Sequence, residues 1–172
     1  GFDFEVDMFF AGELPDCPTQ AISEYDFQII QMPLRPIIPD ESFVRLPHDD
    51  LGAHEALFAH SLGVMRHLLT NSMKWNRTDG LLTFVVPFAT PQQNLIGRLF
   101  PRNDLRNPTY FVERLNQCLS EEIAEYANTY MVDINEIVST YGRKFVSEDV
   151  VAQFNHGSFI NAIFFSAVTA AY

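Results

Sequence analysis

Apolar residues follow two different spacings along this chain, one typical of strands and one typical of helices. Continuous or alternating apolar runs predict strands over residues 2–11, 25–34, 81–89 and 129–134. Apolar residues recurring at spacings of three and four predict a long helix that Asp49 or Asp50 caps and that runs to Trp75. Further helical patterns cover residues 19–24, 107–126, 135–141, 147–153 and 158–171. Since parallel strands need a crossover, usually a helix, this alternation predicts an α/β protein with a parallel sheet.

Two local signals sharpen these boundaries. Asn107 followed by Pro108 predicts a helix start, because the amide can cap the helix and proline suits its first position. Gly142 predicts the end of the helix over 135–141. The proline-rich stretch 33–47 is typical of an irregular connection. With no internal repeat and no linker, the pattern predicts one domain over residues 1–172.

Composition narrows the class of protein. A chain of 172 residues, 47% of them hydrophobic, can bury a sizeable core. Eleven basic residues against 22 acidic ones give a net charge of -11, which argues against nucleic acid or an anionic membrane as partner. Cys17 and Cys118 lie far apart and have no companions at metal or redox spacing. Free thiols, the absence of a signal peptide pattern and no apolar run of roughly 18 residues predict a cytoplasmic location.

Candidate binding residues follow the predicted strands. In open α/β sheets ligands bind beyond the carboxyl ends of strands. The strand over 81–89 leads into a polar loop, and Arg35 follows the strand over 25–34. A third candidate segment, FNHGS, lies between two predicted helices. We expect one pocket lined by Arg35, Gln92, Gln93, Asn94, Arg98, Asn155 and His156. The same residue types also close turns and cap helices, so a purely structural role stays open for each.

The segment HDDLGAH offers a weaker hypothesis. Its His48, Asp49 and His54 are residue types that bind divalent metals, but their spacing fits no standard site, and the aspartates are explained as helix caps. No metal and no cofactor is therefore predicted. His60 and His67 lie on one face of the long predicted helix, where partly buried histidine among leucines is the usual outcome.

Three segments together resemble a known family. They are YDFQIIQMPLR, then LLTFVVPFATPQQNLIGRLFPRNDLRNPTYFVERLNQCLSEEIAEY, then TYMVDINEIVSTYGRKFVSEDVVAQFNHGS. As a set they resemble the SGNH-like domain that precedes the haloacid-dehalogenase-type phosphatase domain in FkbH-like proteins, over about residues 1–158. The resemblance implies a flavodoxin-like three-layer α/β/α sandwich related to GDSL esterases. In those proteins the transfer of a glyceryl-type acyl unit to a carrier protein belongs to the phosphatase domain, which lies outside this sequence.

The chain departs from the hydrolytic pattern of that family. It has no Gly-Asp-Ser sequence, and Gln153 stands where the aspartate before the catalytic histidine is expected, although His156 matches that histidine. Arg35 stands near the position of the oxyanion asparagine, and Gly12 is the candidate for the glycine of the family's second block. Two explanations stay open. The nucleophile strand, which is the first central strand, precedes Gly1, or this branch has lost hydrolysis and kept the cleft.

The resemblance therefore implies an accessory domain that binds or positions an acyl group or an acyl carrier protein without hydrolysing it. The alternative is an esterase, thioesterase or acyltransferase whose serine lies upstream of this chain. A third possibility is a structural dimerisation domain. A sheet lacking its central strand and a Phe-rich ending predict a homo-oligomer.

Overall fold

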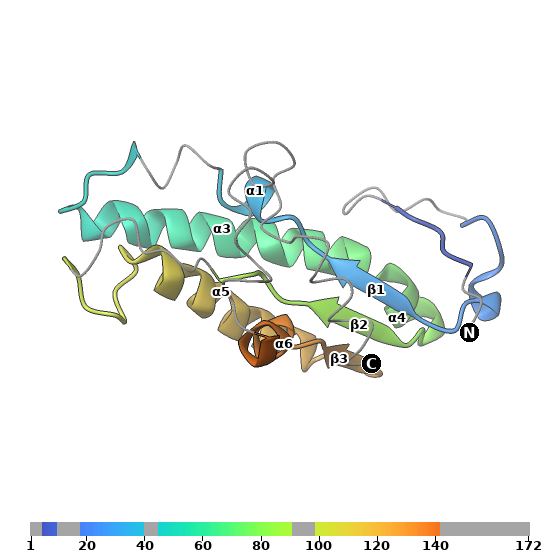
Figure 1. The fold of residues 1–172 in the computed structure, drawn as a ribbon. Coiled ribbons are helices and arrows are strands. Elements are labelled where there is room, and N and C mark those ends of the chain that lie inside the picture. The colour runs from blue at the N-terminus through green and yellow to red at the C-terminus, as the bar shows by residue number, and fades with distance from the viewer. Residues whose placement is uncertain (1–4, 10–17, 40–44, 91–98, 142–172) are drawn as a thin grey trace.

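The computed structural model describes residues 5–9, 18–39, 45–90 and 99–141 (Figure 1). In these ranges the chain alternates between helices and strands. Their order is η1 (Ile22–Glu24), β1 (Gln28–Gln31), α1 (Leu34–Ile37), α3 (Leu51–Ser72), α4 (Lys74–Asp79), β2 (Thr83–Val86), α5 (Pro108–Ile123), β3 (Thr129–Met131) and α6 (Ile134–Tyr141). The predicted α/β class is confirmed.

The strands of the described residues form one parallel sheet in the order β1-β2-β3. β2 is the central strand, with Thr83 paired to Gln28 on one side and to Thr129 on the other. Each strand is shorter than the apolar run that predicted it. Prolines explain the early ends of β1 and β2, because Pro33 and Pro87 follow them closely and have no N–H to continue a ladder.

Helices α3 and α5 cover one face of this sheet and run side by side in Figure 1. Both crossovers step in the same direction across the sheet, so right-handed connections place both helices on the same face. Ile30 and Val85 point to this face and are buried with residues of both helices. The ring of Phe58 on α3 meets that of Phe111 on α5 edge-on, with centroids 5.2 Å apart. A fully buried side chain of this size, such as Phe111, contributes about 1.5–3 kcal/mol, so this layer carries the core.

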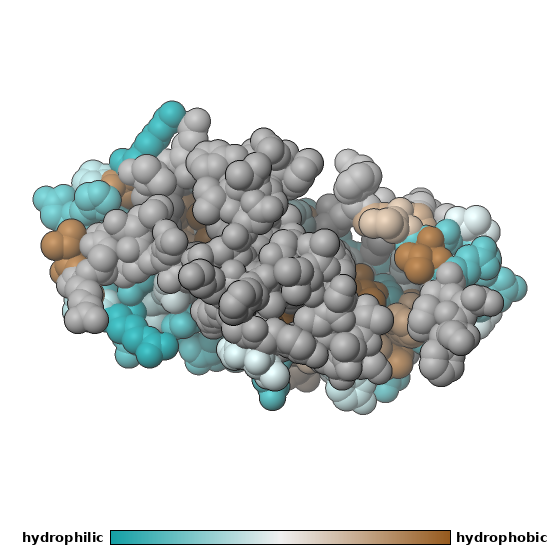
Figure 2. Space-filling model, in the orientation of Figure 1, coloured by the Kyte–Doolittle hydropathy of each residue, from teal (hydrophilic) through white to brown (hydrophobic). Residues whose placement is uncertain are grey.

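The opposite face of the sheet presents an apolar row to the surface. Ile29, Phe84 and Tyr130 are register partners on the three strands. Ile29 is 62% exposed and Tyr130 57% exposed. The ring of Phe84 lies between two others, with centroids 5.7 Å from Phe27 and 6.2 Å from Tyr130. Hydrophobic atoms are visible over β1 and β2 in Figure 2.

Among the described helices, α3, α5 and α6 begin with a polar capping side chain, and those of α3 and α5 stand at predicted positions. The Asp50 carboxylate accepts the Ala53 N–H at 2.9 Å, and the Asn107 carbonyl oxygen accepts the Thr109 N–H at 3.0 Å. The predicted starts of α3 and α5 are thereby confirmed. The long helix ends at Ser72 rather than Trp75, and α4 resumes after Met73.

The predicted strand over residues 2–11 is wrong for its described part, since residues 5–9 form no strand. Side chains hold this segment instead. The Tyr25 hydroxyl donates a hydrogen bond to the Asp7 carboxylate, which raises the pKa of Tyr25. The Phe9 ring packs edge-on against Trp75, with centroids 5.6 Å apart. An alternating pattern forms a strand only where a neighbouring strand pairs with it. Here the contacts of residues 5–9 are side-chain contacts with Trp75 and Tyr25 instead.

Candidate functional site

Three segments leave the sheet at its carboxyl edge, because all three described strands are parallel. Residues 32–35 follow β1, residues 87–90 follow β2, and residues 132–133 follow β3. Arg35 lies in α1, directly beyond β1, and is exposed. Asp133 caps α6 by accepting the Glu136 N–H at 3.0 Å. This edge therefore presents a guanidinium and a capped helix start where α/β proteins bind ligands.

Arg35 is the one predicted site residue that the structure describes, and it lies at the predicted edge. The others lie outside the described residues: Gly12, Gln92, Gln93, Asn94, Arg98, Asn155 and His156. Their convergence with Arg35 stays a prediction.

Asn116 on α5 holds the segment that leaves β2. Its side-chain carbonyl accepts the Phe88 N–H at 2.8 Å, and its amide donates to the Phe88 carbonyl at 2.8 Å. The Asn116 side chain thus makes the two backbone hydrogen bonds that a neighbouring strand would otherwise make. It thereby fixes the direction in which the chain leaves the sheet. The role of Asn116 was not predicted from the sequence. The available signal was an amide on the apolar face of α5, between Val112 and Leu119, which are both buried.

An ion pair within one loop orders the approach to α5. The Arg106 guanidinium donates two hydrogen bonds to the Asp104 carboxylate, at 2.9 and 2.7 Å, and its own backbone N–H donates a third at 2.9 Å. These bonds lower the pKa of Asp104 to about 2, with the Arg106 side chain as the largest cause. The guanidinium also lies over the Phe100 ring, 4.0 Å from its centroid. Arg106 therefore supports the loop. The side chain of Arg102 is in contrast 82% exposed, and its guanidinium lies 3.7 Å from the Glu113 carboxylate.

The histidines of α3 lie where the sequence did not place them. His54 is fully buried, while His60 and His67, predicted to be partly buried, are exposed. His54 Nδ1 lies 2.7 Å from the Asp50 carbonyl oxygen. Because a carbonyl only accepts, Nδ1 carries the hydrogen, and the ring reinforces the first turn of α3. In the described part of the chain, no three His, Cys, Asp or Glu side chains gather as a metal site would require.

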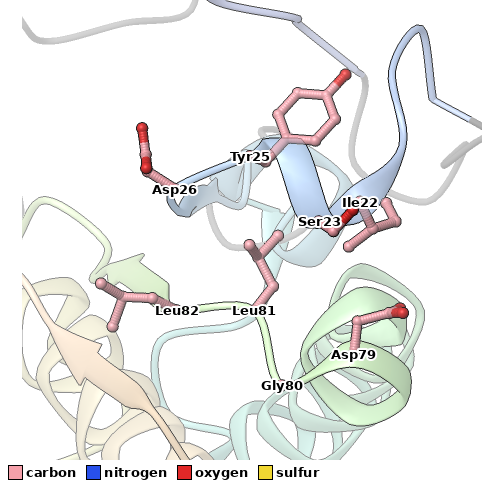
Figure 3. Close-up of a pocket in the computed structure, with 8 residues that line it drawn as sticks. All are labelled: Ile22, Ser23, Tyr25, Asp26, Asp79, Gly80, Leu81 and Leu82. Atoms are coloured by element: carbon pink, nitrogen blue, oxygen red, sulfur yellow. The ribbon is translucent and has the colours of Figure 1, made fainter.

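A shallow pocket of about 410 Å³ lies at the opposite, amino edge of the sheet. Its lining comes from η1 and from the residues just before β1 and β2: Ile22, Ser23, Tyr25, Asp26, Asp79, Gly80, Leu81 and Leu82. Figure 3 shows Leu81 pointing toward η1 and Leu82 pointing away from it. The lining holds two carboxylates and no Lys, Arg or His. The pocket is thus poorly suited to a phosphate or a carboxylate ligand.

Asn76 ties this amino edge together. Its buried amide donates to the Leu81 carbonyl at 2.9 Å and to the Ala127 carbonyl at 2.8 Å, so it joins the segments that enter β2 and β3. Gly80 ends α4 in the left-handed conformation, with φ 70°. Asn128, at φ 52°, donates its side-chain amide to the Gly80 carbonyl at 3.3 Å. The contacts described at the amino edge therefore join the segments that enter β2 and β3, which is a structural role.

Comparison with known proteins finds no match to the chain among family models, curated proteins or solved structures. Across the described ranges, no helix combines the length and the apolar character that crossing a bilayer requires. The functional hypothesis accordingly rests on the residues and their geometry.

Proposed function

We propose that this chain is an SGNH-like domain of the FkbH type, with the flavodoxin-like three-layer architecture, that binds or positions an acyl group or an acyl carrier protein. The observation that supports the proposal best is Arg35, exposed at the carboxyl edge directly beyond β1. The parallel α/β sheet is consistent with such a domain. The acidic pocket at the amino edge plays no part in this function.

Arg35 suits binding better than hydrolysis. A guanidinium is always charged and presents planar N–H donors that match the phosphate of a phosphopantetheine arm or a carboxylate. It serves neither as nucleophile nor as general base. An esterase needs a serine activated by a histidine, which an aspartate orients in turn, and this sequence has Gln153 in the aspartate position and no Gly-Asp-Ser.

The first test measures turnover and binding together. We expect little or no turnover of short-chain nitrophenyl esters. Arg35→Ala should weaken the binding of acyl-pantetheine phosphate by roughly 10- to 100-fold, because a hydrogen bond to a charged group is worth about 1.5–3 kcal/mol. Arg35→Ala should not change the affinity for the same compound without its phosphate.

Arg77→Ala is the matched control. Arg77 is an exposed arginine at the end of α4, where it donates to the Thr70 carbonyl at 3.1 Å. Equal losses in the two variants would contradict a site at Arg35. Robust ester turnover that His156→Ala abolishes would contradict a domain without hydrolysis and would favour an acyl esterase, thioesterase or acyltransferase whose nucleophile lies within this chain.

Self-association accompanies this proposal. Among the described strands, β1 and β3 each have an outer edge with no strand paired to it. Exposed edges of an apolar sheet tend to pair with another chain. We therefore expect a homodimer or a larger closed oligomer, measured by light scattering over a dilution series. A mass of 19.6 kDa at micromolar and higher concentrations would contradict it.

A further inference from the structure

The segment over residues 5–9 lies outside the helix layer and the sheet, beside the amino edge (Figure 1). We call these five residues the strap. We propose that the strap is a latch, closed over Trp75 by two side-chain contacts, that releases as one unit. Its release exposes two hydrogen-bond donors at the amino edge, the Trp75 indole N–H and the Tyr25 hydroxyl. This inference does not depend on the proposed function.

Side chains alone hold the strap against the rest of the described chain. Residues 5–9 form no strand, and no backbone hydrogen bond joins them to another described residue. The Tyr25 hydroxyl donates to the Asp7 carboxylate, and the Phe9 ring meets the Trp75 indole edge-on, with centroids 5.6 Å apart. Two contacts, one polar and one aromatic, therefore decide where the strap lies.

The other side chains of the strap contribute little burial. Val6 is 71% exposed and Met8 is 90% exposed, and Phe9 itself stays 37% exposed. Glu5 is exposed as well. Segments with few buried apolar contacts and little backbone hydrogen bonding open at a low cost in free energy, while the core stays folded. The strap has both properties, so it can open without the sheet and its helices.

The closed strap leaves a polar group of Trp75 unsatisfied. Trp75 is only 7% exposed, and its indole N–H is buried with no hydrogen-bond partner among the described residues. A buried donor without an acceptor is unfavourable, because it has given up water and gained no bond in exchange. Phe9 packs directly on this indole. Opening of the strap admits water to the N–H, which offsets part of the packing that is lost.

Tyr25 connects the strap to the pocket at the amino edge. It belongs to the lining of that pocket, and its hydroxyl points away from Leu81 and Leu82 in Figure 3. The hydrogen bond to Asp7 is the largest cause that raises the pKa of Tyr25 above its ordinary value. The pKa of Tyr25 therefore reports whether Asp7 is in place, just as the exposure of Trp75 reports whether Phe9 is.

Fluorescence of the full chain tests the latch, because Trp75 is the only tryptophan of the sequence. Tyr25→Phe removes the hydroxyl that Asp7 accepts and keeps the ring. We expect acrylamide to quench Trp75 several-fold more efficiently in this variant, with emission at a longer wavelength and an unchanged far-UV circular dichroism spectrum. Tyr130→Phe removes a hydroxyl from an exposed tyrosine on β3 and should change none of these.

A second variant breaks the same bond from the side of the strap. Asp7→Ala should raise the quenching of Trp75 as much as Tyr25→Phe does, since each removes one partner of a single hydrogen bond. Glu5→Ala, which removes an exposed carboxylate from the same strap, is the matched control and should leave quenching unchanged. Asp7→Ala carries the test if Tyr25→Phe disturbs the fold.

The reverse experiment asks whether the two contacts act together. If the strap releases as one unit, Phe9→Ala should lower the pKa of Tyr25 toward its ordinary value, as followed by NMR of the tyrosine ring carbons. An unchanged pKa of Tyr25 in Phe9→Ala would make the contacts independent and overturn the proposal. Quenching of Trp75 that stays unchanged in Asp7→Ala, or rises equally in Glu5→Ala, would overturn it as well.

Discussion

Asn76 holds the amino edge of the sheet from inside the core, whereas Arg35 stands exposed at the carboxyl edge. At the amino edge a buried amide joins two loops, and Gly80 and Asn128 adopt the left-handed conformation to complete the turns. At the carboxyl edge Asn116 anchors the segment that follows β2 through two bonds that are both partly buried, whereas the Asn76 bond to Leu81 is buried. This difference between the amino and carboxyl edges indicates that the two ends of the same strands have different roles. The described contacts at the amino edge maintain the fold, and the carboxyl edge is where the proposed function places its ligand.

The largest expected effect concerns Asn76. Asn76→Ala leaves the Leu81 and Ala127 carbonyls without their side-chain donor. The bond to Leu81 is buried and the bond to Ala127 is partly buried, and an unsatisfied buried polar group costs about 1–3 kcal/mol. We expect a loss of about 2–3 kcal/mol in the free energy of unfolding, measured by urea denaturation. Asn71→Ala, which removes an exposed amide on α3, should cost under about 0.5 kcal/mol. If both variants lose equally little, the amino edge is not held by Asn76.

A smaller loss is expected at the carboxyl edge. Asn116→Ala removes two hydrogen bonds to the Phe88 backbone, but water can partly replace them, so we expect about 1–2 kcal/mol. Faster hydrogen exchange over residues 87–90 should accompany it. Gln117→Ala is the control, since its bond to Glu121 is exposed. A loss as large as that of Asn76→Ala would break the contrast between the edges.

The smallest effect concerns pH. The pKa of Asp104 is lowered to about 2 by Arg106. A carboxylate with a lowered pKa stabilises the fold above its unfolded pKa of about 3.9. That contribution is lost as the pH falls toward 2. In Arg106→Gln the pKa of Asp104 should return toward about 3.9, as followed by carbon NMR of the carboxyl group. Arg102→Gln should leave it unchanged, and a shift in that variant would assign the effect to the general charge of the loop.

Local chemistry explains which predictions were confirmed. Asp50 and Asn107 cap their helices through bonds to residues two or three positions away, so the sequence alone contains both partners. The parallel arrangement was also readable, because alternating strand and helix patterns leave few other solutions. Arg35 lies in α1 beyond the carboxyl end of β1, and its role in a site stays a prediction.

Contacts distant in the sequence explain the rest. Asn76 bonds to Ala127, Asn116 to Phe88, and Phe9 packs on Trp75, and no local pattern pairs these residues. The burial of His54 rather than His60 or His67 depended likewise on how α3 meets its neighbours.

By itself, then, the sequence determined the three paired strands and the main helices between them, the capped starts of α3 and α5, and the acidic charge, but not that residues 5–9 form no strand. Only the tertiary structure decided where each strand stops pairing, which side chains join the loops, and that both crossover helices cover the same face while Ile29 and Tyr130 stay at the surface. The physical reason is that propensity and capping act over a few residues. Strand pairing and core packing depend on which distant segments meet.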